Sequence, residues 1–236
     1  MSISRSLPAR RPFTGLHRLA GGLCVVLFAV SAGFVLATPA LDHLQDLAES
    51  RYGAQGARRV GDWQRVLAEV QSLSAPEQLE RINTLLNRQL HFDDDSAVWK
   101  QSDYWATPLE TLGEGAGDCE DFAIAKYISL RLLGVPDSQL RLIYVRARIG
   151  GPRSSQSQAH MVLGYFPTPE AEPLVLDNLI GEISPASRRP DLFPVFSFNA
   201  EGLWVGNRST ADSSARLSRW RDVLDRMRRE GLQLNP

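Results

Sequence analysis

The spacing of apolar residues changes near Gly134, and this change most constrains the fold. Before it, apolar residues recur at helical intervals, as at Trp63, Val66 and Val70, a pattern typical of an amphipathic helix. After it, the segment LRLIYVRARI at 140–149 alternates with a period of two, which is typical of a strand. Helices first and consecutive strands later predict an α+β domain with helices packed on an antiparallel sheet.

Caps and turn residues divide each half into elements. A capping box (Ser74 and Glu77), a proline at the first position after Thr107, and Gly134 with Pro136 mark helix ends. The predicted helices are 61–73, 74–89, a short one from 107, 118–133 and 215–231. The predicted strands are 140–149, 158–166 and 174–180, with 193–199 and 203–206 as added edge strands. The segment 91–105 is expected to be a loop.

The first 40 residues have the pattern of an export signal. A basic start without acids leads into an apolar run of 19 residues from Leu19 to Ala37, and small residues then offer cleavage after Ala37 or after Ala40. The run is close to the length that crosses a bilayer, so an uncleaved anchor is the alternative. We expect 1–40 to be a signal peptide and 41–236 to be a single domain.

Charge and cysteine content narrow the functional classes. Removal of residues 1–40 takes away four arginines and no acids, so the net charge moves from -1 to -5. This balance argues against a nucleic-acid surface, which would be basic. Cys119 is then the only cysteine in a compartment where disulfides normally form. A lone thiol there is either buried and inert or kept for its reactivity.

The surroundings of Cys119 favour reactivity. It follows the glycine-rich run GEGAG and lies at the start of a predicted helix, where unpaired N–H groups and the helix dipole stabilise a thiolate. His160 lies in the predicted strand 158–166, and Asp177 lies seventeen residues on, in the next one. Adjacent strands could pair them, and the carboxylate would then hold the tautomer of the imidazole.

Three acids surround the thiol and oppose this activation. Asp118, Glu120 and Asp121 flank Cys119, and nearby negative charge disfavours formation of a thiolate. Acids at a helix start can simply complement the helix dipole. The other interpretation is that a cation belongs in the cluster.

The motifs WATPLE, GEGAGDCEDFAIAKY, AHMVLGY and LVLDN together resemble the bacterial transglutaminase-like cysteine proteases of the LapG type. The resemblance covers about residues 63–180. It implies a papain/transglutaminase-like catalytic domain with Cys119 as nucleophile, His160 as general base and Asp177 as the group that orients it.

The resemblance also implies a setting for the activity. Such proteases are periplasmic and calcium-dependent, and they cut large surface adhesins near the amino end, which releases the adhesin and disperses biofilm. A membrane-bound cyclic-di-GMP receptor of the LapD type sequesters the protease.

Calcium would explain the acids around Cys119. The ion takes six to eight oxygen ligands, so Asp118, Glu120 and Asp121 would need carbonyls, waters or an acid from 93–95. The bound charge would let the thiol ionise. For the oxyanion, the backbone N–H of Cys119 is the first candidate donor and the Trp105 indole the second, although a core aromatic is an equally good interpretation of Trp105.

Two other functions stay open from the sequence. The same three residues serve acyl transfer to an amine in transglutaminases. Alternatively, the chain is a non-catalytic binding module, free or membrane-tethered, with an inert thiol.

Overall fold

The computed structural model describes residues 39–205, 208–210 and 216–234, and all of them belong to one compact unit. The predicted signal peptide at 1–40 therefore lies almost entirely outside the described residues. Among those described, no helix is both long enough and apolar enough to cross a membrane.

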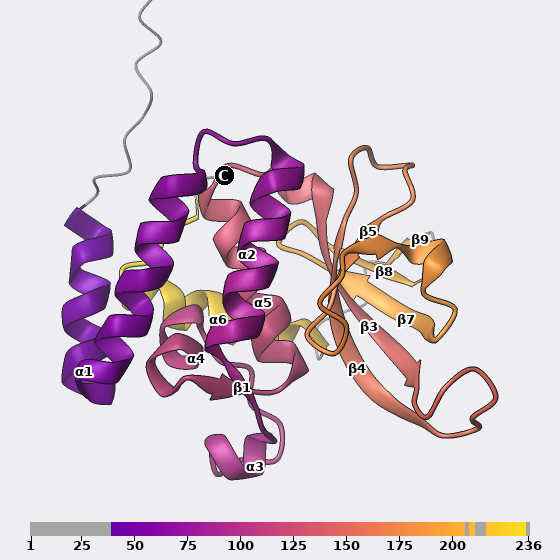
Figure 1. The fold of residues 1–236 in the computed structure, drawn as a ribbon, viewed down its shortest axis with the longest axis horizontal. Helices are drawn as coiled ribbons and strands as arrows, with labels where there is room; N and C mark the ends of the chain where they lie inside the picture. The colour runs from indigo at the N-terminus through magenta and orange to yellow at the C-terminus, as the bar shows by residue number, and fades with distance from the viewer. Residues whose placement is uncertain (1–38, 206–207, 211–215, 235–236) are drawn as a thin grey trace, which may run out of the picture. The chain divides into compact units, whose positions relative to one another are not determined.

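Six α-helices and nine strands make up the described part of the chain (Figure 1). The helices are α1 (Pro39–Val70), α2 (Ala75–Gln89), α3 (Asp95–Val98), α4 (Pro108–Glu114), α5 (Cys119–Leu132) and α6 (Arg216–Arg229). The strands are β1 (His91–Phe92), β2 (Ala116–Gly117), β3 (Leu140–Arg148), β4 (Ser157–Tyr165), β5 (Leu174–Leu176), β6 (Ser184–Pro185), β7 (Leu192–Phe198), β8 (Leu203–Val205) and β9 (Arg208–Thr210).

The first helix is longer than its amphipathic pattern predicted. The expected helix at 61–73 is the second arm of α1, which breaks at Gly53 (φ 70°, ψ −174°). Only glycine adopts such a backbone conformation at little cost, and the chain turns back at this point (Figure 1). The predicted helices beginning near 74, 107 and 118 are confirmed as α2, α4 and α5.

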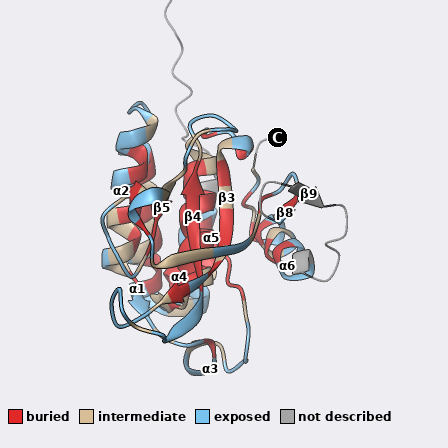
Figure 2. Cartoon of the chain, turned by 90° about the vertical axis from the view of Figure 1, so that its right-hand side faces the viewer, coloured by how far each residue is buried: buried red, intermediate tan, exposed pale blue. Residues whose placement is uncertain are grey.

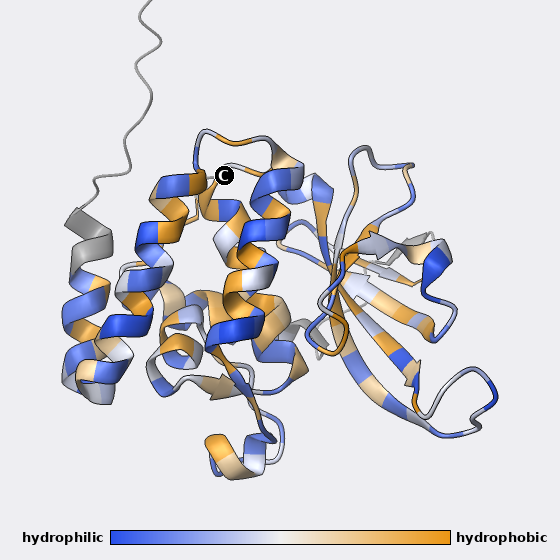
Figure 3. Ribbon diagram, viewed as in Figure 1, coloured by the Kyte–Doolittle hydropathy of each residue, from blue (hydrophilic) through white to orange (hydrophobic). Residues whose placement is uncertain are grey.

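The main sheet has seven strands in the order β6-β5-β4-β3-β7-β8-β9, and every neighbouring pair is antiparallel. Its centre is the long hairpin of β3 and β4, in which Val145 lies opposite His160. Hydrophilic and hydrophobic residues alternate along most of β3 (Figure 3), whereas β4 is exposed at its first three residues and buried from His160 onward. The expectation that 193–199 is an edge strand was wrong, because β7 pairs with β3 inside the sheet.

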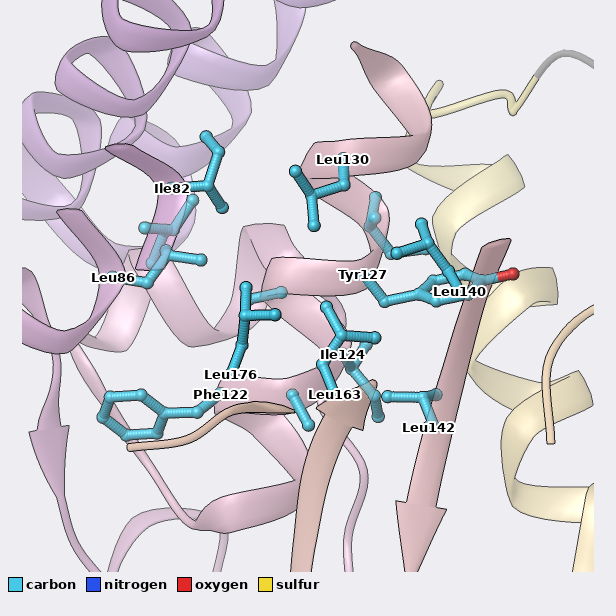
Figure 4. Packing of buried hydrophobic residues seen from close by; sticks show 14 of the residues in the cluster. Ile82, Leu86, Phe122, Ile124, Tyr127, Leu130, Leu140, Leu142, Leu163 and Leu176 are labelled. Carbon is cyan, nitrogen blue, oxygen red and sulfur yellow. The ribbon is translucent and has the colours of Figure 1, made fainter. Parts of the chain in front are cut away.

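The core lies mainly between this sheet and α5. Figure 2 shows α5, β3 and β4 as largely buried, and Ile124 of α5 lies between Leu86 of α2 and the sheet residues Leu142 and Leu163 (Figure 4). A helix covered on several sides is apolar on several sides, which accounts for the broad apolar pattern of α5. The core therefore fixes the start of α5 against β4.

A small parallel sheet places the segment before α3 beside the start of α5. In it, β1 pairs with β2, with Phe92 opposite Gly117, and the N–H of Asp93 donates to the carbonyl of Gly117 at 3.0 Å. The segment 91–105 was expected to be a loop, but it contains β1 and α3. Elements of two and four residues are too short to show a periodic pattern.

Candidate active site

Cys119 is the first residue of α5, and its position depends on its neighbours. Asp118 caps the helix, since its Oδ1 accepts a hydrogen bond from the N–H of Glu120 at 3.1 Å. Gly117 permits a close approach, because a Cβ at this position would lie 2.5 Å from Oδ2 of Asp121. The thiol is largely buried, with 8% of Cys119 exposed.

His160 and Asp177 form a buried hydrogen-bonded pair. His160 Nε2 lies 2.8 Å from Asp177 Oδ1, and each residue is 1% exposed. The sequence predicted Asp177 to lie within a strand, but it is the first residue after β5. An ionised carboxylate can only accept hydrogen bonds, so Nε2 carries the hydrogen. Within the described residues, Nδ1 makes no hydrogen bond.

The environment of Asp177 keeps it ionised. Burial raises its pKa, but hydrogen bonding and charge from His160, the N–H of Leu179 and the Arg189 guanidinium outweigh burial and lower the pKa to about 2. Asp177 is therefore a carboxylate throughout the neutral range.

The thiol lies against the strand segment that carries His160. The backbone N–H of Met161, the residue after His160, lies near the Cys119 sulfur and lowers the thiol pKa. Since α5 packs directly on β4, the fold brings together the helix start and the strand that the sequence singled out.

Burial and the neighbouring acids nevertheless keep the thiol protonated. Cys119 Sγ donates to Oε2 of Glu120 at 2.7 Å. Burial, then the charge of Glu120 and its hydrogen bond, and then the charge of Asp118, raise the pKa of Cys119 far above its ordinary value. The charge pattern in the sequence predicted this direction.

Asp95 joins the acidic cluster. Carboxylate oxygens of Asp95, Asp118 and Asp121 all lie within 4.8 Å of one another, and Glu120 forms an overlapping group with Asp118 and Cys119. Burial and mutual repulsion raise the pKa of Asp118 to about 9. Burial also raises the pKa of Asp121 to about 7, although N–H donors from Ala106 and Trp99 oppose this rise. Nearby positive charge would reverse both effects.

The cluster fits a hard divalent cation. Oδ1 of Asp95 is buried and has no hydrogen-bond partner among the described residues, whereas its Oδ2 accepts from the N–H of Tyr104 at 2.5 Å. An unsatisfied buried carboxylate oxygen is costly, and oxygen ligands of this kind are those that Ca²⁺ prefers.

Trp105 lies in the core near these elements. Its ring stacks on Phe198 with centroids 5.5 Å apart, and it is 6% exposed. Its role as an oxyanion donor stays a prediction, as does that of the Cys119 N–H.

The sequence did not single out two buried cations beside Asp177. Lys126, on α5, is 1% exposed, and Arg189, after β6, is 6% exposed. A lysine within the broad apolar pattern of α5 was a usable signal, because lysine is rarely buried without a reason. Nothing in the run RRPD at 188–191 distinguished Arg189 from a surface arginine.

Comparisons with known proteins show the family and the fold to which this chain is similar. The family model for the bacterial transglutaminase-like cysteine proteinase BTLCP matches residues 60–205. Legionella pneumophila LapG is 41% identical, with 79% of this chain and 97% of that chain covered and a TM-score of 0.68. Its EGTA-treated form is 39% identical, with the same coverage and TM-score.

The calcium-bound form of Legionella pneumophila LapG is 41% identical, with 79% of this chain and 98% of that chain covered and a TM-score of 0.67. A search of curated proteins finds no match. The matches confirm the predicted α+β, transglutaminase-like core and the resemblance to LapG-type proteases. The chain is a cysteine protease and belongs to the bacterial transglutaminase-like cysteine proteinase family.

Proposed function

We propose that this protein is a calcium-dependent cysteine endopeptidase with Cys119 as nucleophile, His160 as general base and Asp177 as the group that orients the imidazole. The observation that carries this proposal is the buried His160–Asp177 hydrogen bond of 2.8 Å on the strand segment whose Met161 N–H lies against the Cys119 sulfur. A nucleophile, a base and an orienting carboxylate are the parts that such catalysis requires.

The reaction follows from these roles. Nδ1 of His160 takes the thiol proton as the sulfur of Cys119 attacks the carbonyl carbon of the peptide bond. When the C–N bond breaks, the imidazolium gives that proton to the leaving amine, and a thioester to Cys119 remains. His160 then takes a proton from water, and the resulting hydroxide attacks the thioester carbon. The C–S bond breaks, the imidazolium returns its proton to the sulfur, and the peptide leaves with a new carboxyl end.

Calcium is the proposed cofactor, held by Asp118, Glu120 and Asp121, which the sequence predicted, together with Asp95. When bound, it supplies positive charge that offsets the carboxylates now raising the pKa of Cys119. Support comes from the mutual proximity of these oxygens and from the existence of calcium-bound and EGTA-treated forms of the Legionella protein.

The proposed setting rests on the family resemblance and on the export pattern of residues 1–40. The protein works in the periplasm, where it cleaves the amino-terminal region of a large surface adhesin and thereby promotes biofilm dispersal. An inner-membrane cyclic-di-GMP receptor of the LapD type holds it inactive.

The test is cleavage of adhesin fragments by the purified protein in calcium, in magnesium and in chelator. We expect cleavage in calcium only, and its loss in Cys119→Ala and His160→Ala without loss of fold. His43→Ala is the matched control, because this histidine is exposed. Turnover by either active-site variant would contradict the assigned roles, and full activity in chelator would contradict only the cofactor.

The same assay separates the alternatives. A lysine-like amine added in excess would be joined to the fragment by an acyl transferase, whereas a protease releases free carboxyl ends. A binding module would leave the fragments intact under every condition.

A further inference from the structure

Arg189 lies on the far side of Asp177 from His160. It follows the short 3₁₀ turn Ala186–Arg188, and only 6% of it is exposed. Its Nη2 donates to Oδ2 of Asp177 at 2.8 Å. Its Nε donates to Oδ1 of Asp191 at 3.0 Å, and Nη2 also reaches Oδ2 of Asp191 at 2.8 Å. The guanidinium thus links a buried carboxylate to a second carboxylate nearer the surface.

This link gives each oxygen of Asp177 its own partners. Oδ1 accepts from His160 Nε2 at 2.8 Å and from the N–H of Leu179 at 3.0 Å, while Oδ2 accepts from Arg189. Rotation of the carboxylate would break a charge-assisted hydrogen bond, which is about twice as strong as a neutral one. Arg189 therefore resists the rotation that would take Oδ1 away from the imidazole.

Burial of the guanidinium requires compensation. Its Nη1 is buried without a hydrogen-bond partner among the described residues, and a buried cation is costly unless it is paired. The other cation facing Asp177 is Lys126 from α5, which acts on it only through charge. Arg189 is thus the cation that holds this carboxylate by direct contact, and Asp191 holds Arg189 in turn.

We propose that Arg189 is a positioning residue for the catalytic pair. It fixes the Asp177 carboxylate, which keeps the hydrogen of His160 on Nε2 and leaves Nδ1 free to take the thiol proton. This inference rests on the proposed role of His160 as the base. It adds a fourth and a fifth member, Arg189 and Asp191, to the three residues that the sequence indicated.

The test combines a spectroscopic signal with kinetics. In the purified, calcium-loaded protein, the buried Nε2–H of His160 should give a low-field imidazole proton resonance in NMR of histidine-labelled samples. Arg189→Met removes the positive charge and keeps the apolar part of the side chain. Arg189→Lys keeps the charge but loses the planar guanidinium that contacts both carboxylates. Arg188→Met is the matched control at an exposed position.

We expect Arg189→Met to shift or broaden the Nε2–H resonance. It should also lower kcat for adhesin-fragment cleavage by about 10- to 100-fold, the range found when outer hydrogen-bond partners of metal-ligating side chains are removed, with KM little changed. Arg189→Lys should restore part of both signals, and Arg188→Met should resemble the wild type. An unchanged resonance and kcat, or a loss confined to KM, would overturn the proposal.

Two further outcomes of this experiment also test the proposal. If Arg189→Met does not fold, Asp191→Asn is tested in its place, because it weakens the contact between Arg189 and residue 191 and leaves the buried His160–Asp177 pair intact. An unchanged Nε2–H resonance and an unchanged kcat in Asp191→Asn would also overturn the proposal. If the wild type cleaves nothing but the resonance still responds to Arg189→Met, the positioning role stands and the proposed function fails.

Discussion

Replacement of Lys126 by methionine should stabilise the protein. Lys126 is 1% exposed, and its Nζ lies 5.9 Å from the centroid of the Phe122 ring. Burial lowers the pKa of Lys126 to about 7, although the negative charge of Asp177 opposes the fall. A change of this size corresponds to at most about 5 kcal/mol of unfavourable free energy for the charged form. Methionine has a similar shape and no charge to bury.

The expected gain depends on pH in a defined direction. The unfolded chain keeps the lysine protonated up to about pH 10.4, whereas the folded protein releases that proton near pH 7. Between these values the unfolded state binds more protons, so this lysine makes the wild type more stable as the pH rises. The advantage of Lys126→Met is therefore greatest at and below pH 7 and shrinks towards pH 10.

Thermal unfolding at several pH values measures this effect. Because the folded pKa of about 7 already includes the attraction to Asp177, we expect a gain of at most about 4 kcal/mol at pH 7, which corresponds to a Tm rise of at most about 12 °C for a domain of this size. Arg88→Met, on an exposed position of α2, is the control and should change stability by less than about 0.5 kcal/mol. A destabilised Lys126→Met protein, or an equal gain at pH 7 and pH 9.5, would refute the reasoning.

Two further predictions concern a buried acid and a glycine. Burial raises the pKa of Glu230 to about 7. Its contribution to stability is therefore present below the unfolded pKa of about 4.3 and is lost as the pH rises through about 7. Glu230→Gln should remove this part of the pH dependence in denaturant titrations at pH 5 and 8, and an unaltered pH dependence would contradict this prediction. Gly117→Ala should weaken the rise in Tm caused by calcium, because its Cβ would lie 2.5 Å from Oδ2 of Asp121. Gly181→Ala is the control, since its Cβ would lie 3.9 Å from its nearest neighbour. Equal rises in Tm with calcium for the two variants would contradict this prediction.

The sequence predicted the elements that carry the reactive groups. The glycine run, the helix cap and the change of period are local signals, and they placed Cys119 at a helix start and His160 in a strand. The capping of α5 by Asp118 and the pairing of β3 with β4 follow directly from these patterns.

Residues that depend on tertiary contacts were not predictable in the same way. The sequence named an acid from 93–95 as a possible further ligand, but it did not single out Asp95. The pairing of β1 with β2 places this segment beside the acidic cluster, and so short a pairing leaves no periodic signal. Arg189 reaches Asp177 from a turn after β6, and no local pattern separates such an arginine from a solvated one. The interior place of β7 likewise depends on a long-range pairing with β3.

The rate at which iodoacetamide alkylates Cys119 tests the central claim. This claim is that the neighbouring acids hold the thiol in its unreactive, protonated form until a cation offsets their negative charge. The rate is measured at pH 7 in calcium, in magnesium and in chelator, from the mass of the peptide that contains Cys119. We predict alkylation at least about tenfold faster in calcium than in chelator, because the thiolate is the reactive form, with little effect of magnesium. Equal rates in calcium and in chelator would contradict the account.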